Sequence, residues 1–181
     1  MAARQQQSYV NGASEVPLIG ETIGQFFDNA CAKWASHPAL TVRHQKVRLS
    51  YAELRQAVDR LAAGLLTLDL HPGDRIGIWS PNNSEWVLTQ FATAKAGLVL
   101  VNINPSYRIA ELEYALNKVG CKALILAERF KTSDYVGMLR ELAPEIDRSA
   151  PGRLQAKRLP LLAALIRIGG DERRGIGRAH V

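Results

Sequence analysis

The sequence predicts an α/β fold in which helices cover both faces of a parallel sheet. Three short apolar runs alternate with two helical patterns along the middle of the chain. They are expected strands at 74–79, 98–103 and 122–127 and expected helices at 84–96 and 109–119. The runs begin about 24 residues apart, the size of a strand plus a crossover helix, and such crossovers join parallel neighbours. The continuous apolar runs Leu98–Val101 and Ala123–Ala127 indicate a sheet covered on both faces.

A helix, a hairpin and a second helix are predicted before the first of these strands. Thr22 and Gln25 have the spacing of a capping box and begin a helix over about 22–35. Its apolar positions at helical intervals are Ile23, Phe26, Phe27 and Ala30, up to Trp34. The β-prone pieces 39–42 and 47–49, separated by polar residues, suit a hairpin with solvated outer side chains.

The second early helix has the clearest pattern in the chain. Ser50 and Glu53 form another capping box, and a helix lasting to about Leu68 follows. Its apolar face consists of Leu54, Val58, Leu61 and Leu65. Beyond Leu139 the pattern weakens, since Pro144, Pro151 and Gly152 interrupt it before a last apolar piece at 159–168.

The positive charge of the chain lies at one end. The 181 residues, 47% of them hydrophobic, carry a net charge of +6. Residues 1–147 hold 15 basic and 15 acidic side chains, so the whole excess lies in 148–181, with eight basic against two acidic. A nucleic-acid arm would interleave aromatic residues, which this basic tail does not contain. We therefore expect no nucleic-acid partner, and interpret the tail as the end of a truncated or frame-shifted product.

Membrane insertion and secretion are not expected from this sequence. No apolar run approaches the roughly 20 residues of a membrane-spanning helix. Residues 1–20 have no apolar secretion signal and are expected to be a disordered lead-in. Cys31 and Cys121 are far apart, without the spacing of a zinc or redox site, and are expected to be buried, reduced thiols. A cytoplasmic protein is the resulting prediction.

No residue is predicted as catalytic, cofactor-binding or metal-binding. The turn Ser80–Ser84 lacks the glycines of a dinucleotide loop, so its side chains are expected to cap a helix, with an anion contact as the alternative. Trp79 and Trp86 flank this turn and are expected to anchor the helix on the sheet, with a pocket role as the alternative. The residues rejected as phosphate-loop glycines or as site histidines are Gly169, Gly170, Gly175, Gly177, His37, His44, His71 and His180.

Two stretches of the chain resemble the signatures of the adenylate-forming acyl-CoA synthetases. The first is Leu49–Leu54, and the second is Ala94–Asn102 followed by Asn104–Pro105. The segments GDRIGIWSPNNSEWV and ELEYALNKVGCKALI are similar to the fatty-acyl members of this AMP-binding family. The likeness runs over 20–147 and more weakly over 159–170. It implies an incomplete, parallel-sheet α/β piece of the large N-terminal domain of the adenylate-forming fold.

The resemblance also implies a reaction for the complete enzyme. A fatty acid, ATP and Mg²⁺ give an acyl-adenylate and pyrophosphate, and coenzyme A then displaces AMP to give acyl-CoA. The family's Ser/Thr/Gly-rich phosphate loop and the lysine-bearing C-terminal domain do not occur in these 181 residues. We therefore expect an inactive N-terminal fragment that binds none of ATP, Mg²⁺ and coenzyme A. A non-catalytic α/β interaction module and a stand-alone nucleotide-binding domain remain the alternatives.

The resulting organisation has three parts. Residues 1–20 are the lead-in, residues 21–147 the partial AMP-binding domain, and residues 148–181 the basic tail. A parallel sheet that ends early exposes strand edges and apolar faces. We expect marginal stability, aggregation and self-association through an exposed sheet edge.

Overall fold

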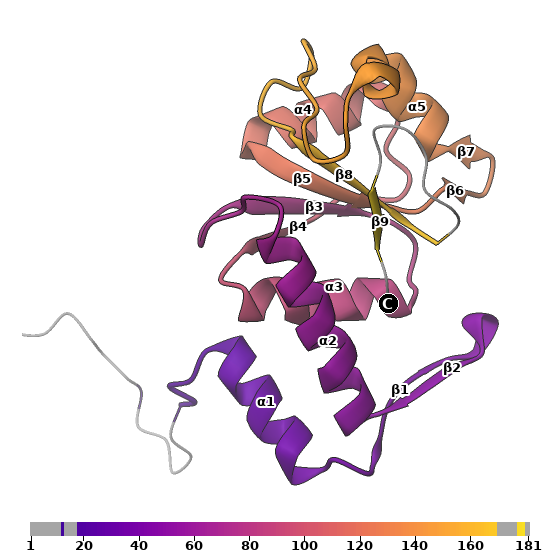
Figure 1. Cartoon of the computed structure of the whole chain (residues 1–181). Helices are drawn as coiled ribbons and strands as arrows, with labels where there is room; N and C mark the ends of the chain where they lie inside the picture. Colours follow the sequence, from indigo (N-terminus) through magenta and orange to yellow (C-terminus); the bar gives the residue numbers. More distant parts are fainter. Residues whose placement is uncertain (1–11, 13–17, 170–176, 180–181) are drawn as a thin grey trace, which may run out of the picture.

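A parallel sheet between two layers of helices forms the centre of the molecule (Figure 1). The computed structural model describes residue 12, residues 18–169 and residues 177–179. The described α-helices are α1 (Ile23–Lys33), α2 (Tyr51–Leu66), α3 (Ser84–Lys95), α4 (Ile109–Val119) and α5 (Tyr135–Leu142). The strands of the main sheet are β3 (Arg75–Trp79), β4 (Val99–Asn102), β5 (Cys121–Leu126), β8 (Ala164–Ile168) and β9 (Gly177–Ala179). The predicted parallel α/β fold is therefore confirmed.

All pairings in this sheet are parallel, and the strands lie in the order β4-β3-β5-β8-β9. The chain thus moves from β3 to β4 on one side, then returns across β3 to place β5 on the other side. Helix α4 makes this return on the same face as α5, whereas α2 and α3 cover the opposite face (Figure 1). This reversal of direction at β3 decides where a site can form.

Side-chain alternation along β3 divides the interior into two cores. Ile76 and Ile78 point into the core under α1, α2 and α3, while Trp79 points into the core under α4 and α5. Gly77 lies on the Trp79 face, where a Cβ atom would come within 2.9 Å of methyl groups of Ile103 and Leu124. The absence of a side chain at Gly77 therefore lets β3 approach its neighbours closely.

The two predicted capping boxes are present. Thr22 Oγ1 accepts from the Gln25 backbone N–H at the start of α1, and Ser50 Oγ accepts from that of Glu53 at the start of α2. Between these helices lies the predicted hairpin, in which β1 (Pro38–Val42) pairs antiparallel with β2 (Val47–Ser50) around the short 3-10 helix Arg43–Gln45.

The apolar face predicted for the first helix is wrong in part. Phe27 and Cys31 are buried against α2 and α3, but Ile23 and Phe26 are 61% and 50% exposed. Both sets of residues fit a helical period, so the pattern could not distinguish the inner face from the outer one. Gly24 lies on the buried side, where a Cβ atom would come within 3.3 Å of Lys95, so its lack of a side chain lets α1 approach α3.

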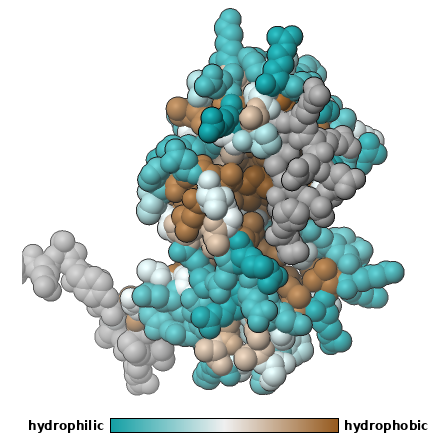
Figure 2. Space-filling view, in the orientation of Figure 1, coloured by the Kyte–Doolittle hydropathy of each residue, from teal (hydrophilic) through white to brown (hydrophobic). Residues whose placement is uncertain are grey.

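The prediction that both faces of the sheet are covered holds for β5 and only partly for β4. Residues Ala123–Leu126 are fully buried. Strand β4 lies at the edge of the sheet, and Val99 is 47% exposed there. Figure 2 shows a band of hydrophobic surface across the middle of the molecule, between hydrophilic regions.

The fold continues beyond residue 147, where the sequence predicted a basic tail. Strand β8 pairs with β5, and Leu154, Leu159 and Leu162 are buried in the core under α4 and α5. Helix α5 was not predicted either, although Asp134 caps it by accepting from the Gly137 backbone N–H at 3.0 Å. Residues 148–169 therefore belong to the same layered unit as the preceding strands.

Candidate functional site

The carboxyl ends of β3 and β5 are the natural place for a ligand in this sheet. In open parallel sheets, ligands bind where the loops after two neighbouring strands leave toward opposite faces. Here the loop after β3 leads to α3 on one face, and the segment after β5 leads to α5 on the other. The candidate site therefore lies between Trp79–Ser80 and Ala127–Glu128.

Two stacked aromatic rings fill one side of this position. The ring centroids of Trp79 and Tyr135 lie 3.7 Å apart with the planes 12° from parallel, and both residues are completely buried. The Trp79 indole N–H donates to the backbone carbonyl of Asn104 at 3.2 Å. Trp79 thus joins the end of β3 to the loop after β4. It lies on the α4 and α5 face of the sheet and does not anchor α3, contrary to the prediction, whereas Trp86 does pack against the core under α3.

Tyr135, which no sequence pattern indicated, completes this arrangement. Its hydroxyl donates to the backbone carbonyl of Pro105 at 2.5 Å. Burial raises the pKa of the Tyr135 phenol to about 12, so the group is neutral at physiological pH and serves as a hydrogen-bond donor. Tyr135 therefore ties α5 to the β4–α4 loop.

The start of α3, where a dinucleotide fold would hold phosphate, is already capped by protein groups. Asn83 Oδ1 accepts from the Trp86 backbone N–H at 2.9 Å, and Gln45 Oε1 accepts from that of Ser84 at 2.7 Å. Gln45 Nε2 also donates to the Glu85 carboxylate at 2.7 Å. Because two helix N–H groups are occupied and a carboxylate lies beside them, a phosphate would meet few donors and a negative charge. The predicted capping role of this turn is confirmed.

A charged pair lies at the carboxyl end of β8. Arg167 Nη1 is 3.1 Å from Glu128 Oε2, and the Arg167 side chain is only 4% exposed while that of Glu128 is 45% exposed. The backbone carbonyl of Glu128 accepts from the Tyr135 N–H at 3.1 Å. Sequence reasoning missed this pair because it depends on the pairing of β5 with β8, which are separated by about 40 residues of chain.

The other candidates of the sequence are scattered. His37, His44 and His71 are exposed and lie in separate turns, whereas His180, Gly170 and Gly175 lie outside the described residues. Cys31 and Cys121 are both buried free thiols, as predicted. Burial raises the pKa of Cys121 to about 11 and, with the nearby Asp28 carboxylate, raises that of Cys31. Within residues 18–169 and 177–179, no three His, Cys, Asp or Glu side chains group as metal ligands.

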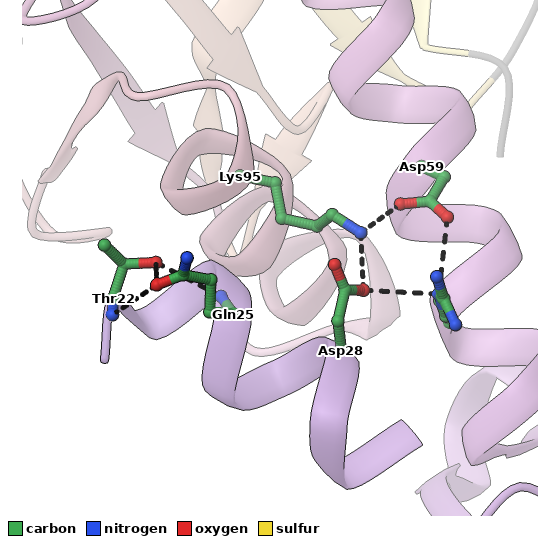
Figure 3. Close-up of polar contacts among 6 residues, drawn as sticks. Thr22, Gln25, Asp28, Asp59 and Lys95 are labelled. Atoms are coloured by element: carbon green, nitrogen blue, oxygen red, sulfur yellow. Dashed lines mark hydrogen bonds and ion pairs between the residues drawn. The ribbon is translucent and has the colours of Figure 1, made fainter. Parts of the chain in front are cut away.

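Lys95, from the second signature stretch, holds three helices together (Figure 3). Its ammonium lies 2.6 Å from Asp28 of α1 and 2.5 Å from Asp59 of α2. Arg55 of α2 contacts the same two carboxylates, at 3.2 and 3.8 Å. Two cations and two anions thus form a neutral network, and its only visible role is structural.

Comparison with known proteins identifies the family of this chain. Residues 27–164 match the family described as AMP-binding enzyme. The chain belongs to the AMP-binding enzyme family. The fold and the resemblance inferred from its signature stretches are thereby confirmed.

The curated relatives of this AMP-binding chain are acyl-CoA ligases. It is 42% identical over 161 residues to the medium-chain acyl-CoA ligase ACSF2, mitochondrial, of Rattus norvegicus, a match that covers 89% of this chain and 26% of that protein. It is 34% identical to the putative acyl-CoA synthetase YngI of Bacillus subtilis, covering 88% and 29%. The chain therefore spans about a quarter of the length of the relatives it matches.

Solved structures of longer enzymes contain the same fold. A Mycobacterium tuberculosis fatty acyl CoA synthetase superimposes with a TM-score of 0.68 at 23% identity, over 81% of this chain and 26% of that one. The anthranilate CoA ligase AuaEII gives a TM-score of 0.71 at 19% identity, over 90% and 27%. These likenesses establish the shared architecture of the sheet and its helices.

The two signature stretches of the AMP-binding chain have structural positions. Leu49–Leu54 ends β2 and starts α2 through the Ser50 cap. Ala94–Asn102 ends α3, turns at Gly97 and forms β4. Gly97 has a positive φ of 71°, a backbone conformation that favours glycine.

Proposed function

We propose that this chain is the supporting N-terminal α/β part of an ATP-dependent acyl-CoA synthetase and that it does not catalyse the reaction by itself. The complete enzyme would convert a fatty acid, ATP and coenzyme A to acyl-CoA, AMP and pyrophosphate. Matches to acyl-CoA ligases over 88–89% of this chain support the assignment to this class of reaction. The role of the chain would be to hold neighbouring segments of the complete domain in place.

The observation that carries this proposal concerns the switch point of the sheet, the position between the carboxyl ends of β3 and β5. Protein side chains fill this position. A ligand-binding sheet keeps polar groups available at the carboxyl ends of its strands. Here Trp79 and Tyr135 stack at the end of β3, and Asn83 and Gln45 cap the start of α3. These groups are used to hold the fold together, so they leave little capacity for binding a nucleotide.

ATP, Mg²⁺ and coenzyme A belong to the proposed complete enzyme. The residues at the start of α3 do not fit a triphosphate, because Glu85 would repel it and the nearby N–H groups of Ser84 and Trp86 are already bonded. We therefore assign no cofactor contact and no catalytic step to any described residue. A fatty acid of medium chain length is the proposed acid substrate, since relatives that are 42–45% identical are named for that substrate class.

Pyrophosphate release tests the proposal directly. The purified chain would be incubated with ATP, Mg²⁺, coenzyme A and octanoate, with a full-length medium-chain acyl-CoA ligase as positive control. We expect release from the control and none from the 181-residue chain. Pyrophosphate formed by the chain in proportion to its concentration would overturn the proposed supporting role.

Calorimetric titration separates the two alternatives. Tight ATP binding by the isolated chain would favour a stand-alone nucleotide-binding domain, which the capped start of α3 argues against. An α/β interaction module would bind neither ATP nor octanoate and would be retained by a protein partner. A supporting part of a larger domain is also expected to bind neither compound, so retention by a separate protein partner is the result that would favour the interaction module.

The cytoplasm stays our proposed location, because buried free thiols are typical of proteins in a reducing compartment. Among the described residues, no helix is long and apolar enough to cross a bilayer. The mammalian relatives are named mitochondrial, so cell fractionation of an epitope-tagged chain is the appropriate test. Recovery with mitochondria would contradict a cytoplasmic location.

A further inference from the structure

Among the residues that the structure describes, helix α1 is attached to the rest of the molecule on one side only. It packs against α2 and α3, below the sheet in Figure 1, and its opposite side exposes Ile23 and Phe26. The buried residues of α1 are Gly24, Phe27 and Cys31. A helix of 11 residues is marginal without tertiary contacts, so the stability of α1 depends on this one packed side.

The apolar part of the attachment is small. Phe27 stacks on Phe91 of α3 with ring centroids 4.3 Å apart. Gly24 lies so close to α3 that a Cβ atom would be 3.3 Å from the Lys95 Cα. Cys31 is 2% exposed and lies beside Arg55 and Asp59, at the α1–α2 contact.

The polar part of the attachment is the four-residue ion-pair network centred on Lys95, shown in Figure 3. Lys95 is the least exposed member, with 17% of its side chain accessible, while Asp28 is 32% and Asp59 and Arg55 are 45% exposed. Asp28 is the member contributed by α1, and it contacts both cations. Water and salt reach three of the four groups, so the attraction is sensitive to ionic strength.

We propose that α1 is a releasable element of the fold, held on α2 and α3 by the Lys95 network, and that its release exposes Cys31 while Cys121 stays protected. Elements with few buried contacts and partly solvated ion pairs open locally at lower free energy than the central sheet. Cys121 begins β5, is 1% exposed, and lies next to β3 in the middle of the sheet. This inference depends on the geometry of α1 alone and not on the proposed function.

The two thiols provide an internal comparison within one molecule. In a pulse of iodoacetamide, each thiolate displaces iodide and forms a stable thioether. Mass spectrometry of the tryptic peptides then gives a separate labelling rate for Cys31 and for Cys121. We expect Cys31 to react faster at low salt, and an increase to about 0.5 M NaCl to accelerate Cys31 about two- to fivefold without changing Cys121.

A Lys95→Met variant tests the network itself. Met keeps an apolar stem beside Gly24 but cannot bind Asp28 or Asp59. We expect Cys31 labelling about two- to fivefold faster than in the wild type and less sensitive to salt, since only the Arg55–Asp28 pair still joins α1 to α2. Loss of the Lys95 charge would by itself raise the pKa of Cys31 and slow alkylation, so acceleration reports opening of α1. Lys122→Met, which removes an ion pair with Asp74 away from α1, should leave the Cys31 rate unchanged.

Two results would overturn the inference. One is a common labelling rate for both thiols under all conditions, since this would mean that Cys31 becomes accessible only on global unfolding. The other is a Cys31 rate in the wild type that does not respond to salt. If Lys95→Met fails to fold, the wild-type salt dependence alone decides the question.

Discussion

The Lys95 ammonium lies 2.6 Å from a carboxylate oxygen of Asp28, and this contact joins the last turn of α3 to the middle of α1. The two residues are 67 positions apart in the chain. Asp59 of α2 meets the same ammonium. One side chain from a family signature stretch therefore connects three helices, in a part of the molecule that is remote from the carboxyl edge of the sheet.

Loss of this ammonium should lower the global stability. Lys95→Met is expected to reduce the free energy of unfolding by about 1 kcal/mol, at the upper end for ion pairs because the side chain is mostly covered. Urea denaturation followed by circular dichroism would measure the change. Lys122→Met removes an ion pair whose lysine is more exposed, so it should lower the free energy of unfolding by less. Equal decreases in the two variants would argue against a special role of Lys95.

The contribution of Lys95 should disappear in alkali. Burial lowers the pKa of Lys95, but hydrogen bonds to Asp28 and Asp59 outweigh burial and raise it above its ordinary value of 10.5. Because the folded state holds this proton more tightly than the unfolded state, the stabilisation is complete below pH 10.5. It is lost as the pH rises through the folded pKa.

Urea midpoints of the wild type and Lys95→Met, compared between about pH 8 and 11.5, would reveal this loss. The pKa of Cys121, about 11, lies in this range and that of Tyr135, about 12, lies just above it, but both groups are present in both proteins, so their effects cancel in the difference. The stability gap should narrow above pH 10.5. A gap that stays constant over the whole range would contradict the assigned role of the Lys95 proton.

The cap of α3 should be measurable by a single substitution. Asn83→Ala removes the acceptor for the Trp86 backbone N–H and is expected to cost about 1 kcal/mol of stability. Asn83→Asp keeps an acceptor at the same position and should restore most of the loss. The exposed neighbour Asn82 provides a matched control, since Asn82→Ala should change the urea midpoint little.

The Tyr135 hydroxyl should stabilise the fold near the carboxyl ends of the strands through its one hydrogen bond to the β4–α4 loop. Tyr135→Phe retains the stack on Trp79 but leaves the Pro105 carbonyl without this donor, at an expected cost of about 1 kcal/mol. Tyr135→Leu also removes the stacked ring and should cost clearly more. Thermal unfolding of the three proteins would rank them, and a Phe variant as stable as the wild type would show that the hydroxyl contributes nothing.

Self-association is expected at the β4 edge of the sheet. Val99 is 47% exposed on this edge strand, which pairs with β3 on one side. A charged residue on an open edge disfavours strand pairing between molecules. Val99→Lys should therefore shift sedimentation velocity profiles toward the monomer, whereas Tyr114→Lys, on the outer side of α4, should not. A wild-type chain that is monomeric at all concentrations would be evidence against this edge as an interface.

Local sequence patterns predicted the elements well because their causes are local. The capping boxes at Thr22 and Ser50 depend on residues three positions apart. Gly120, with a positive φ of 67°, ends α4 where the expected helix ended. Helix α5 could have been predicted in the same way, from Asp134 as a cap followed by Val136, Leu139 and Leu142.

Pairings between distant segments were beyond the reach of these patterns. The buried Arg167 could not be assigned to Glu128 before β8 was known to lie beside β5. Likewise, Leu98–Val101 has the composition of a buried strand, but the strand order places β4 at an edge. Composition reports how apolar a strand is and does not report which neighbours it has.

The sequence by itself determined the α/β class, the positions of the early helices and strands, the buried thiols and the family, because these follow from short-range periodicity, capping and local motifs. Only the tertiary structure decided which side of α1 is buried, that residues 148–169 join the sheet, and that the switch point is filled by Trp79 and Tyr135. These features depend on contacts between segments far apart in the chain. Such segments are brought together by the packing of the whole core and not by any local pattern.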